Sequence, residues 1–226
     1  MASTKVVEKK KAEVAVVEGP PKLAITADDI EIARLNIIQQ SSSIEGDVGS
    51  VVLDRSITLM APEEVCAVIP VNAVKAWRED IPFGNAEIPR IANTEEQRKA
   101  IEEDSAFGTI EFAEITLLFP KPDNADDDLY PFPIGDDTYA LGKVNVAKDG
   151  YRCTYKRLAT FSAFNPDMPI CAKMWKFKAE LLTRGMNSWY VPSLQATTED
   201  SPEDVKGFIT RITSKLWILN QNLCRR

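Results

Sequence analysis

The apolar residues of this chain fall in short runs that proline, glycine and aspartate interrupt, and this pattern constrains the fold most. The runs are rich in valine, isoleucine and phenylalanine, and most have the length of a single β-strand. One pair flanks Asp149-Gly150, a strong hairpin signal because glycine accepts the positive φ of such turns. The strand-like segments are 50–53, 57–60, 65–78, 112–120, 138–147 and 151–161. They predict a mainly antiparallel sheet or a small barrel.

Three further segments carry helical signals. They are 93–104, 169–185 and 201–219. The first has Asn93 as a candidate N-cap and Glu96 three residues later, as in a capping box, and its charged surface predicts a peripheral helix. The second repeats apolar residues at helical spacing and ends at Gly185, a plausible C-cap. The third begins with Ser201 as N-cap and Pro202 at the first helical position. The predicted class is α+β, with a peripheral helix and two C-terminal helices.

The chain divides into a leader and one domain. Residues 1–25 are rich in Lys, Glu, Val and Ala, lack a sustained period and predict a flexible tail. Residues 26–226 are expected to form a single domain. No apolar run approaches the roughly 20 residues that span a bilayer, so we expect a soluble, cytoplasmic protein without membrane contact. The four cysteines show no CxxC spacing, which favours reduced, mostly buried thiols over structural zinc.

The chain contains no histidine, and this argues against catalysis. The commonest general base and the commonest transition-metal ligand are both missing, and no phosphate-loop or nucleophile-elbow motif is present. The Asp-rich segment 123–137 lacks the glycine and glutamate positions of an EF-hand, so a solvated acidic loop is expected there. We expect no enzyme activity, no metal and no cofactor.

Charge is polarised along the sequence. The net charge is −7, yet residues 143–184 contain nine basic and three acidic residues, a local charge of +6. This segment also carries tyrosine and tryptophan. Cations that follow a phosphate backbone, interleaved with aromatic rings on which bases stack, are typical of single-stranded nucleic-acid binding.

The candidate nucleic-acid-binding residues come from this segment and from the end of the strand-like run 65–78. They are Trp77, Arg78, Tyr151, Arg152, Tyr155, Lys156, Arg157, Lys173, Trp175 and Lys176. An ordinary reading stands beside the functional one: Trp77 can be an amphipathic residue at a sheet edge, and the cations can be solvated. If 151–157 is a strand, Tyr151 and Tyr155 cannot share a face with Arg152 and Lys156. Either the tyrosines face a groove with Arg157, or they are core and only the cations are free.

Several stretches also resemble a known group of proteins. They are IARLNIIQQSS, VCAVIPVNAVKAWRE, EITLLFP with its Pro/Asp-rich loop, GYRCTYKR and KMWKFKAELL. Their order over about 30–219 resembles tailed-bacteriophage proteins with an N-terminal arginine-leucine segment and a Trp-rich strand. The resemblance implies a single-stranded DNA-binding protein with an OB-like barrel. Phage single-strand binders often end in an acidic recruitment tail, whereas this chain ends in the basic NQNLCRR.

Two functions therefore stay in view. The first is a non-catalytic single-stranded DNA-binding protein of phage-like replication or recombination, with replication or recombination proteins and a homo-oligomer as possible partners. The second is a virion structural or assembly protein that uses the N-terminal segment as an arm.

Overall fold

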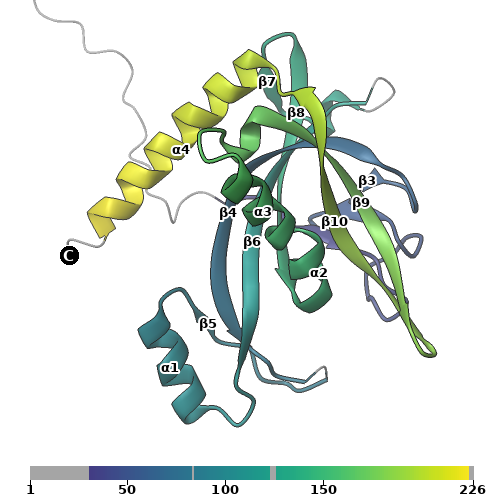
Figure 1. Cartoon of the computed structure of the whole chain (residues 1–226). Coiled ribbons are helices and arrows are strands. Elements are labelled where there is room, and N and C mark those ends of the chain that lie inside the picture. The colour runs from purple at the N-terminus through teal and green to yellow at the C-terminus, as the bar shows by residue number, and fades with distance from the viewer. Residues whose placement is uncertain (1–30, 83, 123–125, 224–226) are drawn as a thin grey trace, which may run out of the picture.

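The computed structural model describes residues 31–82, 84–122 and 126–223. The predicted tail, residues 1–25, lies outside these ranges. The described part is α+β and mainly antiparallel sheet, as predicted (Figure 1).

The main sheet has seven strands in the order β10-β9-β4-β6-β8-β7, with β5 paired to β4. Their bounds are β4 Cys66–Glu79, β5 Ile91–Ala92, β6 Thr109–Pro120, β7 Phe132–Ile134, β8 Asp137–Ala147, β9 Lys173–Arg184 and β10 Asn187–Asp200. The strands β10 and β7 end the order, so the described sheet is open. Of the two predicted architectures, the antiparallel sheet is the one observed, and the OB-like closed barrel is not.

The first core cluster lies between one face of this sheet and a second, smaller sheet. The smaller sheet comprises β1 Leu35–Ile37, β2 Val51–Leu53 and β3 Ile57–Met60. Ile115, Leu117 and Phe119 of β6 point into this cluster because alternate residues share a face. Phe119 packs edge-on against Phe177 of β9, with ring centroids 5.5 Å apart.

The second core cluster includes residues of the C-terminal helix α4, Glu203–Leu223. Leu118 of β6 joins it, together with Val205 and Ile209 of the helix. The part of β6 from Ile115 to Phe119 is therefore buried on both faces, which explains its mostly apolar sequence. The predicted helix at 201–219 is confirmed, but the Ser201 hydroxyl has no hydrogen-bond partner among the described residues and does not act as a cap.

The predicted strand 151–161 is wrong. Asp149-Gly150 does not form a hairpin turn: the chain leaves β8 at Lys148, which has a φ of 50°, and enters α2, Lys148–Cys153, and α3, Tyr155–Phe164. Tyr151, Leu158 and Phe161 join the first core cluster from these helices. Helical and alternating periods both fit this short segment, and packing against the sheet selected the helix.

The predicted helix at 169–185 is also wrong. After a 3-10 turn at Ile170–Ala172, the segment forms strand β9. Alternate residues Trp175, Phe177 and Ala179 are buried, whereas Leu181, which belonged to the predicted helical stripe, is 53% exposed. Gly185 lies in the two-residue turn to β10, where its φ of 62° suits glycine. The residues that follow this turn form β10.

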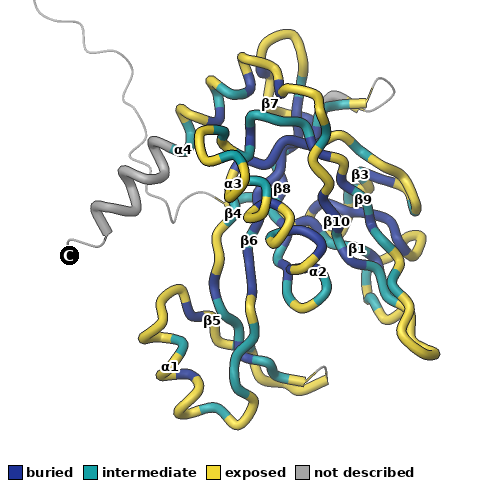
Figure 2. Tube along the Cα trace, viewed as in Figure 1, coloured by how far each residue is buried: buried dark blue, intermediate teal, exposed yellow. Residues whose placement is uncertain are grey.

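The peripheral helix α1 is confirmed at Glu95–Asp104, with a shifted cap. Thr94 rather than Asn93 is the N-cap, and Gln97 completes the capping box. The far halves of β4 and β6 carry this helix and β5 away from the body of the molecule (Figures 1 and 2). We call residues 79–109 the arm. Arg90 holds it together, with ion pairs of 3.0 Å to Glu79 and 2.7 Å to Asp104.

The outer edge of β10 is blocked by side chains. The Gln39 amide accepts a hydrogen bond from the Tyr190 N–H and donates one to the Tyr190 carbonyl, each 2.8 Å long. The Arg157 guanidinium donates to the Leu194 carbonyl at 2.9 Å. Between these two points lies Pro192, which has no N–H. Such contacts occupy groups that would otherwise pair with another strand.

Candidate nucleic-acid interface

One exposed region brings together several of the predicted residues with three that the sequence analysis missed. It lies on the part of β4 and β6 between α1 and α3. We call it the aromatic-basic face. Its members are Lys75, Trp77, Arg98, Glu111, Tyr151, Tyr155 and Lys156.

The strand register builds the centre of this face. Trp77 of β4 pairs with Glu111 of β6, so the two side chains lie on the same side of the sheet. Lys75 is two residues before Trp77 and shares that side. The half-buried Trp77 ring has two cations nearby, Lys75 Nζ at 5.3 Å and the Arg98 guanidinium of α1 at 5.7 Å from its centroid. These distances are typical of cation–π contacts.

The helices α2 and α3 supply the other side of the face. The Tyr151 and Tyr155 rings stack with centroids 4.9 Å apart, and Lys156 Nζ lies 5.9 Å from the Tyr151 ring. Tyr151 is 4% exposed, whereas Tyr155 is half-buried. The alternatives left open for the tyrosines therefore resolve differently at each position: Tyr151 is core, and Tyr155 extends its ring stack toward the surface. Burial raises the pKa of Tyr151, which stays protonated at neutral pH.

Glu111 sets the charge of the face. Its carboxylate lies 3.0 Å from Lys75 Nζ and 3.6 Å from Lys156 Nζ. The hydrogen bond from Lys75 lowers the pKa of Glu111, so the carboxylate is ionised at neutral pH. Arg98 is paired with α1 carboxylates, Glu95 at 2.7 Å and Glu102 at 3.9 Å. An incoming phosphate would therefore compete with carboxylates for these cations.

Three predicted residues have structural roles instead. Trp175 is 1% exposed, packs edge-on against Phe161 at 5.3 Å and donates to the Ile170 carbonyl, so it cannot stack on a base. Arg157 joins α3 to the edge of β10. Lys173 is bound by Asp200 at 2.6 Å.

The remaining predicted cations lie away from this face. Arg78 is on the opposite side of β4, 6.0 Å from the Phe112 ring. Arg152 pairs with Asp149 at 3.0 Å. Lys176 is exposed on β9 and lines a pocket together with Met174 and Thr197. The expectation of one continuous site that contains all ten residues is therefore not met.

The three residues that sequence analysis missed differ in whether any sequence pattern pointed to them. Lys75 stands two residues before Trp77, and alternation along a strand places them together. Arg98 and Glu111 reach the face only through the arm and the β4–β6 register, which no local pattern revealed.

Comparison with known proteins finds no counterpart: no protein-family model, curated protein or solved structure matches this chain. Within the described ranges, no group of three or more His, Cys, Asp or Glu side chains is placed to hold a metal ion. No helix in the described part has the length and apolar character needed to cross a bilayer.

Proposed function

We propose that the chain is a non-catalytic single-stranded DNA-binding protein and that DNA binds across the aromatic-basic face. The observation that carries the proposal is the half-buried Trp77 ring on β4, with Lys75 and Arg98 within 6 Å of its centroid. A base that stacks on Trp77 would have its phosphates near these cations.

The second half of the face supports the same function. Tyr155 continues the ring stack from the core toward solvent, and Lys156 follows it in the first turn of α3. Base–aromatic stacking contributes roughly 1–3 kcal/mol per base and tolerates any sequence. We therefore propose binding without strong base preference.

The test is a fluorescence-anisotropy titration of labelled oligo-dT at several salt concentrations. If Lys75, Arg98 and Lys156 each neutralise one phosphate, log Kd should change with log salt with a slope of about 2, because each phosphate on a single strand contributes about 0.7. Trp77→Ala should weaken binding by roughly 1–3 kcal/mol. Phe132→Ala, which removes an exposed aromatic side chain from β7, is the control.

Binding that is equally strong in Trp77→Ala, or independent of salt, would rule out this face as the DNA site.

Residues 79–109, the arm defined above, support a second candidate function, that of a virion structural or assembly protein. Ile88 is 89% exposed, Ile91 50% and Phe107 38%, which is unusual for apolar side chains on one small extension. Size-exclusion chromatography with light scattering separates the two candidates: a large, defined assembly that Ile88→Ser disperses, without DNA binding, favours assembly.

A further inference from the structure

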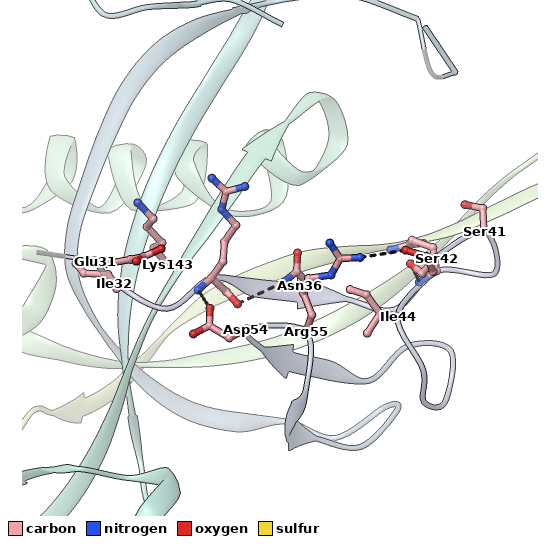
Figure 3. Close-up of a pocket in the computed structure, with 12 residues that line it drawn as sticks. Glu31, Ile32, Asn36, Ser41, Ser42, Ile44, Asp54, Arg55 and Lys143 are labelled. Carbon is pink, nitrogen blue, oxygen red and sulfur yellow. Dashed lines mark hydrogen bonds between the residues drawn. The ribbon is translucent and has the colours of Figure 1, made fainter. Parts of the chain in front are cut away.

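A second site lies at the edge of β8, in a pocket of about 720 Å³ (Figure 3). The segment 31–44, the β2–β3 turn and Lys143 form its walls. A volume in this range suits a small molecule and exceeds what a bare ion fills. The pocket shares no residue with the aromatic-basic face, so inferences about it are independent of the proposed DNA binding.

Three cations line the pocket: Arg34, Arg55 and Lys143. In the described part of the chain, neither arginine forms a side-chain ion pair, and Lys143 has one partner, Glu114 at 3.3 Å. The pocket's own carboxylates are Glu31 and Asp54, and Asp54 Oδ1 already accepts the Arg34 backbone N–H at 2.9 Å. The lining therefore holds three cations and two carboxylates, and the two guanidinium groups are the cations without an ion-pair partner among the described residues.

The serine hydroxyls add further donors. Ser43 accepts a hydrogen bond from Arg55 at 3.1 Å, and Ser42 accepts one from the Gln39 N–H at 2.9 Å. Neither hydroxyl donates a hydrogen bond among the described residues, so each can donate its proton to an incoming acceptor. Guanidinium and hydroxyl donors of this kind match the acceptor oxygens of a phosphoryl group.

The backbone fixes these donors in place. Asp54 and Arg55 have φ values of 46° and 65°, a region that non-glycine residues adopt at a cost. Reciprocal hydrogen bonds hold this turn against the neighbouring segment: Arg34 N–H to Asp54 Oδ1, and Asp54 N–H to the Arg34 carbonyl, both 2.9 Å. These φ values belong to the hairpin turn between β2 and β3, which places Arg55 in the pocket lining.

We propose that this pocket binds a phosphate monoester, with Arg34 and Arg55 as the principal phosphate contacts. Lys143 and the two serines complete the donor set. The volume that the phosphoryl group leaves free accommodates the small polar molecule that carries it.

The test uses isothermal titration calorimetry at low salt, with thymidine 5′-monophosphate, inorganic phosphate and uncharged thymidine as probes. We expect the monophosphate to bind, phosphate to bind more weakly and thymidine to bind at least tenfold more weakly than the monophosphate. Arg34→Gln and Arg55→Gly should each weaken the monophosphate at least tenfold. Lys99→Gln, which removes an exposed cation on α1, should leave binding unchanged.

Arg55→Gly also separates loss of binding from loss of folding. Glycine adopts a φ of 65° readily, so this variant should not lower the midpoint of thermal unfolding while it removes the guanidinium. A second comparison identifies the source of the phosphoryl group, using oligo-dT with a 5′-phosphate or a 5′-hydroxyl. A preference for the phosphorylated end that Arg55→Gly abolishes indicates a nucleic-acid terminus, and equal affinity indicates a small molecule.

The proposal is overturned if none of the phosphorylated probes binds, or if Arg34→Gln and Arg55→Gly bind the monophosphate as tightly as the wild type. Neither outcome affects the Trp77 test of DNA binding, because Trp77 does not line the pocket.

Discussion

Glu111 opposes the function that we propose for its neighbours. Its carboxylate holds both Lys75 and Lys156, so two of the three cations on the aromatic-basic face are partly neutralised. Glu111→Gln keeps the side-chain size and removes the charge. We expect DNA affinity to increase about fivefold, equivalent to roughly 1 kcal/mol, the usual size of an exposed ion-pair effect.

The anisotropy titration measures this change, and Glu103→Gln is the control because it removes the same charge from an exposed position on α1. Unchanged or weaker binding in Glu111→Gln would contradict the proposed path of the phosphates.

At the residue scale, sequence reasoning proposed Trp77, Tyr155 and Lys156 because they are aromatic or basic, and the structure places the three on the aromatic-basic face. It misassigned Trp175 because burial is a tertiary property: Trp175 and Trp77 look alike in sequence, yet Trp175 is 1% exposed and Trp77 lies at the surface.

At the element scale, two neighbours on α3 should behave in opposite ways. Arg157 donates to Ser193 Oγ and to the Leu194 carbonyl, both at 2.9 Å, whereas Lys156 is exposed on the aromatic-basic face. Arg157→Ala should lower the free energy of unfolding by about 1 kcal/mol or more, since it removes hydrogen bonds from a charged donor. Lys156→Ala should change stability by less than about 0.5 kcal/mol.

The affinity for DNA should show the reverse order: Lys156→Ala should lower it, and Arg157→Ala should change it little. Chemical denaturation and anisotropy, measured on both variants, check the pair. Equal effects of the two substitutions on both quantities would refute the separation of roles.

Elements whose sequence fits one secondary-structure pattern were predicted correctly. Elements whose sequence fits both the helical and the strand pattern were not. β6 and α1 each carry one signal, an apolar run and a capped charged helix, and both were found. The segment that forms β9 satisfies the helical spacing of Ile170, Met174 and Phe177 and also the strand alternation of Trp175, Phe177 and Ala179. The partner decides between them: Cys66–Val68 of β4 pairs with Trp175–Phe177, a contact more than 100 residues away in the chain.

For the whole molecule, the arm couples stability to pH. Hydrogen bonds from Arg90 and Ser105 lower the pKa of the Glu79 carboxyl to about 2, from an ordinary value of 4.5. The contribution of this carboxylate to stability is fully present above pH 4.5 and is lost as the pH falls through about 2. Glu79→Gln should therefore be less stable than wild type at neutral pH, and the difference should shrink across this window.

Thermal unfolding between pH 2 and pH 6 measures the difference, and hydrogen exchange of the arm locates it. Glu103→Gln, which alters an exposed arm carboxylate without an ion pair among the described residues, is the reference. A difference that stays constant with pH would show that Glu79 does not act through its charge.

The blocked edge of β10 has a consequence for the protein at high concentration. Where many copies lie close together, an open strand edge can pair with a neighbouring copy and start a fibril. The Gln39 amide and the Arg157 guanidinium occupy hydrogen-bonding groups of β10 from within the same chain, so this edge resists such pairing.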